Sequence, residues 1–162
     1  TGAPAPPAAA RAASPPPAPD PAAAPVLLAA AREALQGARY AEAARLAARA
    51  GLAAPLEPAA CIVEGRARAT VGDDEGALRA LRRAVALDPS AGHARFLLAG
   101  ALARTGQGGA ASREYRAAAA VLPHTPAEDL DDLLDGCDVA ALVALCSRLA
   151  AEADGTPAGG RR

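Results

Sequence analysis

The chain has 162 residues, enough for one ordinary domain. Aromatic residues make up 2% of it, so its core cannot be filled mainly by aromatic side chains. The β-branched and aromatic residues that a sheet favours are scarce, and the composition therefore favours an all-α fold of closely packed helices. The net charge is −1, and residues 24–125 carry 13 arginines against 9 acidic residues, a mixture that does not resemble a nucleic-acid-binding surface.

Residues 1–23, "TGAPAPPAAARAASPPPAPDPAA", form a Pro/Ala tract. Proline fixes φ and has no N–H to donate, so this tract is expected to be an extended, solvated and disordered linker. We expect it to connect to a domain upstream of the sequence given. No run is apolar enough or long enough to span a membrane, and no signal peptide is recognisable, so the expected location is the cytoplasm.

An internal repeat of 34 residues begins after the linker. Three sets of residues recur at this period: Ala43, Ala77, Ala111; Ala50, Ala84, Ala118; and Pro55, Pro89, Pro123. They divide the chain, without insertion, into repeats 24–57, 58–91 and 92–125. A helical unit of this length cannot bury its own apolar face, so neighbouring repeats are expected to stack.

Each repeat is predicted to be a helical hairpin. The first helices are expected over 25–36, 58–70 and 91–104, and the second helices over 40–51, 74–87 and 108–121. Turns fall at Gly37-Ala38, Gly72-Asp73 and Gly106-Gln107, where glycine relieves left-handed strain at a helix C-terminus. Small residues are expected where the two helices approach: Ala31, Gly65 and Ala99 on the first, facing Ala43, Ala77 and Ala111 on the second.

Repeat two departs from a simple apolar pattern. Glu64 and Arg68 occupy positions of the first helix where apolar residues normally pack. Their i,i+4 spacing allows an ion pair along the helix. The sequence leaves open whether this helix is partly exposed or locally rotated.

The segment 126–154 is acidic, with one arginine against 8 acidic residues, a net charge of −7. Leu130, Leu133 and Leu134 predict a short amphipathic helix. Asp138 is a suitable N-cap for a second helix over 139–149, whose apolar side is predicted to contain Val139, Leu142, Val143, Leu145, Cys146 and Leu149. Stacked repeats need a terminal helix to cover the last hairpin, and we assign that role to this segment. The tail 155–162 is expected to be disordered.

No pattern in the sequence points to catalysis, a cofactor or a metal. "GQGGAA" at 106–111 follows a helix and coincides with a turn, which argues against nucleotide binding. "DLDDLLDG" at 129–136 lacks the acids that a calcium loop needs. Three cysteines, Cys61, Cys137 and Cys146, have no metal-knuckle spacing and are predicted to be small buried residues. The chain is therefore predicted not to be an enzyme.

The repeat positions carry a family pattern. Repeat two has Gly65, Gly72, Ala77, Leu81, Ala84 and Pro89; repeat three has Ala99, Gly106, Ala111, Tyr115, Ala118 and Pro123. Repeat one keeps Tyr40 but has Ala38 where glycine is usual and Ala47 where a bulky residue is usual. This pattern resembles tetratricopeptide-repeat (TPR) arrays. The resemblance implies an α-solenoid of three hairpins with C-terminal capping helices, and a role in protein–protein interaction.

In TPR proteins, particular first-helix positions line a concave groove that binds a peptide or helix. The resemblance assigns this groove to Leu28, Arg32, Gln36, Ile62, Val63, Arg66, Thr70, His93, Phe96, Leu97 and Arg104. Arg32 and Arg66 share a repeat position, so a partner with apolar anchors and one or two carboxylates is expected. The alternative, that these arginines only aid solubility, stays open. The chaperone-binding carboxylate clamp needs Lys and Asn where this chain has leucine or valine, so chaperone tails are not expected partners.

A narrower resemblance covers residues 75–153. "ALRRAVALDPSAGHARFLLAGALARTGQGGAASREYRAAAAVL", followed by "LLDGCDVAALVAL", is similar to the TPR extension of bacterial chemotaxis receptor methyltransferases of the CheR type. It implies a regulatory region behind an S-adenosylmethionine-dependent methyltransferase domain. The implied partner is a chemotaxis receptor or that upstream domain. The alternative is a scaffold or adaptor TPR domain of an unrelated multidomain bacterial protein.

Overall fold

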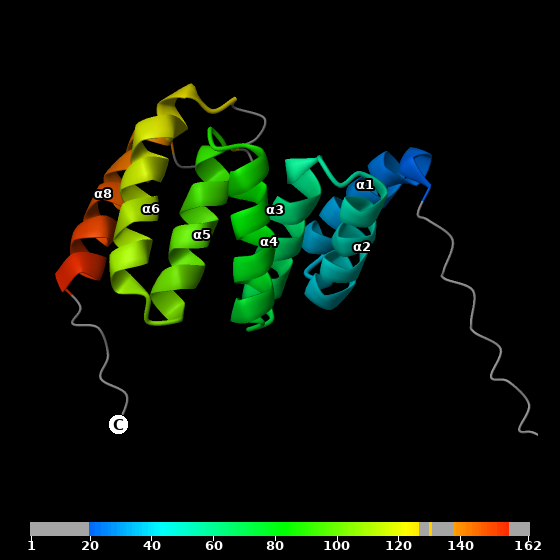
Figure 1. The fold of residues 1–162 in the computed structure, drawn as a ribbon, viewed down its shortest axis with the longest axis horizontal. Helices are drawn as coiled ribbons and strands as arrows, with labels where there is room; N and C mark the ends of the chain where they lie inside the picture. The colour runs from blue at the N-terminus through cyan, green and yellow to red at the C-terminus, as the bar shows by residue number, and fades with distance from the viewer. Residues whose placement is uncertain (1–19, 127–129, 131–137, 156–162) are drawn as a thin grey trace, which may run out of the picture.

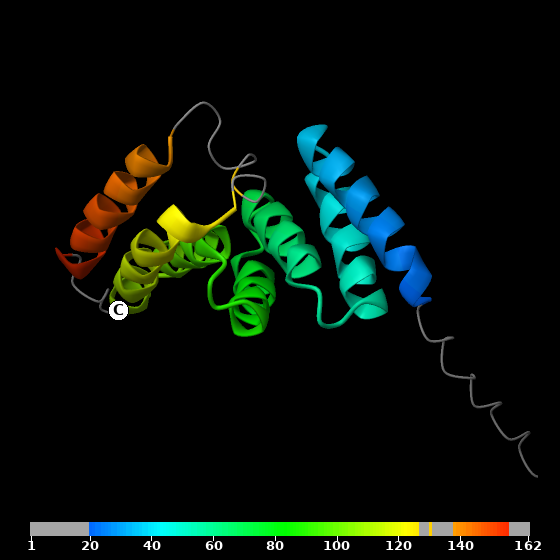
Figure 2. The same ribbon diagram turned by 90° about the horizontal axis from the view of Figure 1, so that it is seen from above.

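Three helical hairpins follow one another along an arc, with α4 on its outer side, α3 on its inner side, and α1 and α8 at its ends (Figure 2). The computed structural model describes residues 20–126, 130 and 138–155. The hairpins are α1 (Ala24–Gln36) with α2 (Tyr40–Ala53), α3 (Pro58–Thr70) with α4 (Asp74–Leu87), and α5 (Gly92–Arg104) with α6 (Gly108–Val121), and α8 (Val139–Gly155) follows them (Figure 1). The described residues contain no strand. The predicted all-α solenoid is confirmed.

Several sequence predictions lie outside the described residues: the linker over 1–19, Leu133 and Leu134 of the short helix, Cys137, and the tail from 156 onward. The last residues of the predicted linker are described and differ from the prediction. Pro21–Ala23 forms a 3₁₀ helix, η1, whose first turn is capped by Asp20, because its Oδ1 accepts from the N–H of Ala22 at 2.9 Å. A second 3₁₀ turn, η2 (Leu122–His124), continues α6.

Side-chain caps fix the start of three helices. Glu57 accepts from the N–H of Ala59 at 3.3 Å at the start of α3, and Pro58 follows it. Asp73 Oδ1 accepts from Gly76 at 2.9 Å at the start of α4. Asp138 Oδ1 accepts from Ala141 at 2.6 Å, as predicted for α8. Each cap satisfies a backbone donor that has no partner within the helix.

The turn between the two helices has one geometry in all three hairpins. The residue at repeat position 15 has positive φ: 57° at Ala38, 83° at Gly72 and 74° at Gly106. The next residue donates to the carbonyl five residues back, at 2.8 Å (Arg39 to Ala34), 3.0 Å (Asp73 to Arg68) and 2.9 Å (Gln107 to Leu102). This is the Schellman pattern. The prediction that Gly37 takes the left-handed conformation was wrong: its φ is −79°, and Ala38 takes that conformation instead.

Ala38→Gly should therefore raise the free energy of unfolding by about 0.5–1 kcal/mol, because it removes the left-handed strain on a Cβ and costs only chain entropy. Gly37→Ala is the matched control and should change stability by less than about 0.5 kcal/mol. Urea unfolding followed by circular dichroism measures both. A destabilised Ala38→Gly variant would contradict the strained turn.

The small residues predicted at the contact between paired helices are buried. Ala31, Ala43, Ala77, Ala99 and Ala111 are each 0% exposed. Gly65 is also buried, and a Cβ built on it would lie 2.4 Å from Cγ of Leu81. The two helices of the central hairpin can approach this closely only because residue 65 has no side chain.

The charged pair of repeat two is partly buried and internally satisfied. Arg68 Nε lies 2.8 Å from Glu64 Oε1, and Arg68 Nη1 lies 2.6 Å from Asp73 Oδ2. The pKa of Asp73 is lowered, most strongly by the hydrogen bond from the N–H of Gly76 and next by the hydrogen bond from the Arg68 guanidinium. Charged side chains therefore take the place of apolar packing here. The ion pairs of Arg68 with Glu64 and Asp73 join α3 to the residue that caps α4.

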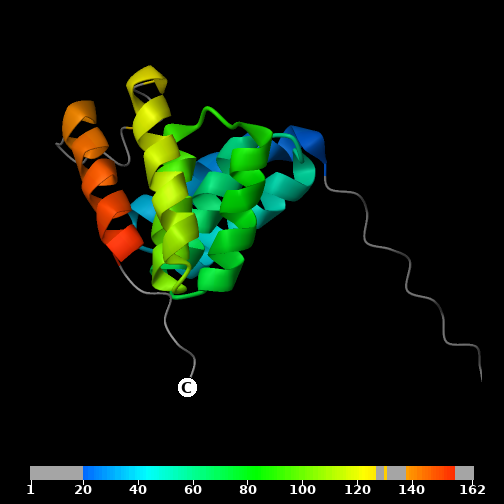
Figure 3. The same cartoon turned by 60° about the vertical axis from the view of Figure 1, so that its left-hand side comes forward.

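Helix α8 lies alongside α6 at the C-terminal end of the array (Figure 3). Leu142, Cys146 and Ala150 are buried, while Val139, Val143, Leu145 and Leu149 pack against the same cluster, so the predicted apolar side is confirmed. Leu130 is fully buried in this cluster too. The helix is longer than predicted, and its last turn places Asp154 in an ion pair with Arg116 of α6. It covers the last hairpin.

Candidate partner-binding surface

The predicted groove residues lie on α1, α3 and α5, the first helices of the three hairpins. On α1, Leu28 is half-buried and packs against the core between the first two hairpins, whereas Arg32 and Gln36 are exposed. Leu28 can offer only its outer part to a partner, so α1 contributes mainly one guanidinium and one amide.

On α3, the structure separates the four predicted residues. Ile62 and Arg66 are partly exposed, and the exposed Thr70 donates its hydroxyl to the carbonyl of Arg66 at 3.0 Å. Val63 is 6% exposed and belongs to the core with Ala47 and Ala67, so it has almost no surface for a partner. We leave Val63 out and use "inner surface" for the other ten predicted residues.

On α5, Phe96 and Leu97 are partly buried against the C-terminal core. The Phe96 ring meets Tyr115 of α6 edge-on, with centroids 6.0 Å apart and planes at 61°, a favourable geometry that fixes its orientation. His93 is partly exposed. The pKa of Asp88 is lowered mainly by hydrogen bonds from Ser90 and to a smaller extent by the nearby His93. Arg104 is exposed, but its Nε lies 2.8 Å from Asp74 Oδ1 of α4. A partner would have to compete with Asp74 for Arg104.

The inner surface therefore combines half-buried apolar side chains with guanidinium groups. Its apolar members are Leu28, Ile62, Phe96 and Leu97, one or two on each first helix. Arg32 and Arg66 occupy one repeat position on neighbouring first helices. This arrangement can bind a segment that carries both apolar side chains and carboxylates.

Other kinds of site are not visible in the described part of the chain. Residues 20–126, 130 and 138–155 contain no group of three His, Cys, Asp or Glu side chains that could hold a metal ion. Cys61 and Cys146 are buried free thiols, as predicted, and burial raises the pKa of both, that of Cys146 to about 11. A raised pKa disfavours the nucleophilic thiolate. Among the described helices, none could cross a membrane.

A hollow on the outer side of the array was not predicted from the sequence. It lies between α3 and α4, has a volume of about 200 Å³, and is lined by Cys61, Glu64, Arg68, Gly76, Arg79, Ala80 and Arg83. The signal that could have found it is the recurrence of arginine at repeat position 22, in Arg45, Arg79 and Arg113.

No protein-family profile and no curated protein matches the chain. Solved structures do. The first TPR domain of Spaghetti (RPAP3), bound to the HSP90 peptide SRMEEVD, is 17% identical with a TM-score of 0.69, over 87% of this chain and 100% of that chain. PcrH, in complex with the chaperone-binding region of PopD, is also 17% identical with a TM-score of 0.69, over 80% and 90%. The TPR2B domain of yeast Sti1, in complex with an Hsp70 peptide, is 16% identical with a TM-score of 0.65, over 80% and 96%.

The chain has the fold of a TPR array. Three helix pairs in stacked hairpins followed by a terminal helix agree with this assignment. The identities are too low to carry more than the fold, so the binding partner has to be inferred from the surfaces of this chain. The resemblance to chemotaxis methyltransferases stays a prediction.

Proposed function

We propose that this TPR array is a protein-interaction module that binds a segment of a partner protein on its inner surface. The observation that carries the proposal is the arrangement on α1 and α3, where Arg32 and Arg66 share a repeat position beside the half-buried Leu28 and Ile62. Solved TPR structures with peptides bound, those of RPAP3 and Sti1, support this mode of use.

The chemistry of the inner surface defines the partner. Leu28, Ile62, Phe96 and Leu97 offer limited apolar area, because each is partly buried in the array itself. Guanidinium groups bind carboxylates with two donors in one plane and so add direction as well as charge. A suitable segment is a helix or extended peptide with two or three apolar anchors and one or two acidic residues.

The parent protein that we propose is a chemotaxis receptor methyltransferase of the CheR type, with this array as its C-terminal regulatory region in the cytoplasm. The partner would then be a chemotaxis receptor or the methyltransferase domain itself. The similarity of residues 75–153 to such extensions supports this proposal. The coding sequence that precedes residue 1 tests it: an S-adenosylmethionine-binding domain there is expected, and any other domain would favour the alternative, a scaffold on an unrelated protein.

Arg66→Glu should weaken partner binding by more than about 1 kcal/mol, the upper end for an exposed ion pair. Arg66 lies on the central hairpin, so a bound segment cannot avoid it by shifting along the array. The partner is first captured from the native bacterium with the full chain and then titrated by calorimetry. The peptide SRMEEVD is a useful second probe and should not bind, because the positions of the carboxylate clamp are Leu28, Val63 and Leu97.

Arg148→Glu on α8 is the matched control. Arg148 is an exposed arginine whose Nε lies 3.8 Å from Glu152 Oε1, so its reversal changes the net charge equally without touching the inner surface. It should leave the dissociation constant within about twofold. Equal losses in both variants would mean that net charge, and not the inner surface, determines binding.

A further inference from the structure

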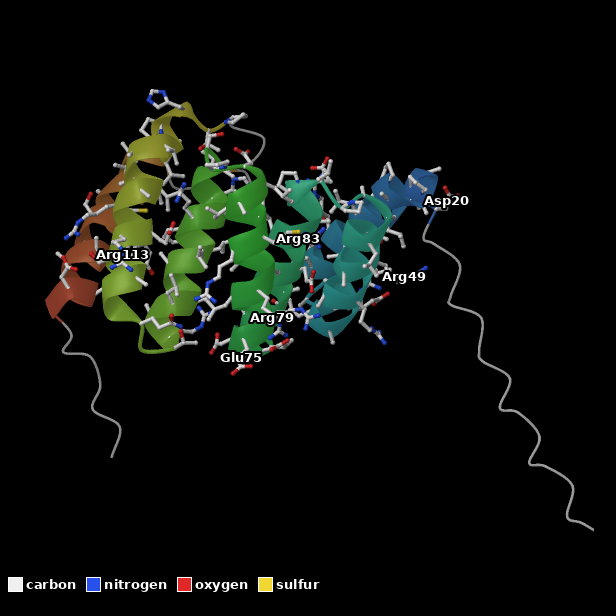
Figure 4. The ribbon with its side chains drawn as sticks, viewed as in Figure 1. Asp20, Arg49, Glu75, Arg79, Arg83 and Arg113 are labelled. Carbon is white, nitrogen blue, oxygen red and sulfur yellow. The ribbon has the colours of Figure 1, made fainter. Side chains whose placement is uncertain are left out.

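The second helices carry a regular row of arginines on the opposite side of the array. Arg45, Arg79 and Arg113 recur at a spacing of 34 residues, and Arg49 and Arg83 follow the first two by four residues. All five are exposed. Figure 4 shows Arg49, Arg79, Arg83 and Arg113 on the face formed by α2, α4 and α6. We call these five residues the outer arginine row.

The acidic residues of the second helices do not neutralise this row. Three of them pair with arginines from elsewhere: Glu42 with Arg39 at 3.0 Å, Asp74 with Arg104 at 2.8 Å, and Glu114 with Arg95 at 2.8 Å. The fourth, Glu75, lies 4.0 Å from Arg79, with side chains 90% and 70% exposed. Such an exposed pair contributes little.

Within the described residues, the side chains of Arg45, Arg49 and Arg113 make no hydrogen bond or ion pair. Arg83 donates Nη2 to the carbonyl of Pro55 at 2.8 Å. A hydrogen bond to a carbonyl orients the guanidinium but does not neutralise its positive charge. Arg79 lies near the carboxylates of Glu75 and Asp73, whereas the other four arginines of the row have no carboxylate partner among the described residues, so the outer arginine row is a strip of net positive charge.

The hollow between α3 and α4 interrupts this strip at its centre. Arg79 and Arg83, one helical turn apart, line it, and its other walls include the small residues Gly76 and Ala80. Arg68 also lines it, but that charge is already matched by Glu64 and Asp73. A volume of about 200 Å³ admits an acidic side chain, and three of the four charged residues that line the hollow are arginines.

One end of the strip carries apolar surface. Leu52 and Leu56 are 65% and 83% exposed. Leu52 lies three residues after Arg49, and Leu56 directly follows Pro55, whose carbonyl binds Arg83. Cationic and apolar groups thus lie together where α2 leads into α3.

We propose that the outer arginine row binds an acidic segment of a second partner protein, with one carboxylate in the hollow between Arg79 and Arg83 and an apolar side chain against Leu52 and Leu56. The positive charge of the outer arginine row is complementary to the negative charge of an acidic segment. The exposed leucines lie only at one end of the strip, which suits a single apolar side chain of a peptide better than insertion of the strip into a membrane surface. Nucleic acid does not suit a chain with a net charge of −1. This surface lies on the second helices, so it does not depend on the proposed function of the inner surface.

The test uses the full chain and a fluorescein-labelled peptide of three Glu-Glu-Leu triplets, titrated by anisotropy at low and at physiological ionic strength. The native chain should bind it with an affinity that falls as salt rises, since exposed charges are screened. The double variant Arg79→Glu/Arg83→Glu should weaken binding by about tenfold or more. The Gln-Gln-Leu version of the peptide should not bind.

The matched control is Arg39→Glu/Arg148→Glu, which changes the net charge equally at two exposed arginines outside both the inner surface and the outer arginine row, and it should weaken binding by less than about twofold. Unchanged far-UV circular dichroism establishes that both variants are folded. The proposal is overturned if the native chain does not bind the peptide, if both double variants lose affinity equally, or if Arg32→Glu/Arg66→Glu loses affinity while Arg79→Glu/Arg83→Glu does not, which would place the peptide on the inner surface. Tighter binding to phosphatidylserine vesicles or duplex DNA than to the peptide would also overturn it.

Discussion

Leu81→Ala should lower the free energy of unfolding by about 2–5 kcal/mol, because the side chain is 0% exposed at the centre of the array. Gly65→Ala should also destabilise the protein, since its new Cβ would lie 2.4 Å from Cγ and 2.7 Å from Cδ2 of Leu81. Overpacking of this kind costs about 1–3 kcal/mol. In the double variant, the two changes should compensate, so the cost of Leu81→Ala becomes smaller by about 1 kcal/mol or more.

Gly100→Ala is the matched control for Gly65→Ala. Gly100 lies on α5, one position further along its repeat than Gly65, and a Cβ there would lie 3.7 Å from Tyr115 Oη, an ordinary van der Waals distance. It should stabilise the helix by about 0.5–1 kcal/mol, as alanine does in place of a mid-helix glycine. Chemical denaturation of the four variants measures these values. If Gly65→Ala and Gly100→Ala change stability alike, or the cycle shows no coupling, the close approach of α3 and α4 is not as described.

The hairpins could be predicted because their requirements recur at fixed positions. A close helix contact needs a small residue on both sides, and the chain supplies one at 34-residue intervals; the buried Ala43, Ala77 and Ala111 confirm that reasoning. The turn of repeat one was harder. Gly37 and Ala38 are adjacent, and a rule that assigns positive φ to glycine selects the wrong one. The repeat register, which places residue 38 with Gly72 and Gly106, selects the right one.

Val63 shows why surface residues are less predictable than cores. Its repeat position lines the groove in TPR proteins, but exposure depends on how closely the neighbouring helix approaches. Ala47, on α2, stands where a bulky residue is usual, and it lies with Val63 in one core cluster. Both side chains are buried in this cluster, where a partner cannot reach Val63. A tertiary effect of this kind does not follow from the position of Val63 in its own repeat.

The ion pairs could be predicted only in part. The Glu64–Arg68 pair follows from i,i+4 spacing along one helix. Pairs between helices, such as Arg104 with Asp74 and Arg95 with Glu114, join residues far apart in sequence. These long-range pairs engage two of the four acidic residues of the second helices, Asp74 and Glu114, with arginines outside the outer arginine row. The periodic arginines were visible in the sequence, but it did not show that Arg45 and Arg113 have no carboxylate partner among the described residues.

Leu142→Ala should loosen α8 from α6 without unfolding the first two hairpins. Leu142 is 6% exposed and packs in the C-terminal cluster beside Cys146, so its truncation removes about 2–5 kcal/mol from that contact. A terminal helix contacts only one neighbour, and in stacked repeats stability is close to a sum of local terms. The expected result is a local opening that exposes the Cys146 thiol.

Iodoacetamide labelling at pH 8, followed by mass spectrometry of the peptides, measures this opening separately at Cys146 and at Cys61. Both thiols are buried in the native protein, and burial holds the pKa of Cys146 at about 11, so its native labelling should be slow. Leu142→Ala should speed labelling of Cys146 by at least about thirtyfold, the factor that 2 kcal/mol gives, and leave Cys61 unchanged. Ala144→Ser, on the exposed side of α8, should change neither rate. Equal acceleration at both cysteines in Leu142→Ala would contradict an independently opening cap, because it would mean that α8 detaches only when the whole array unfolds.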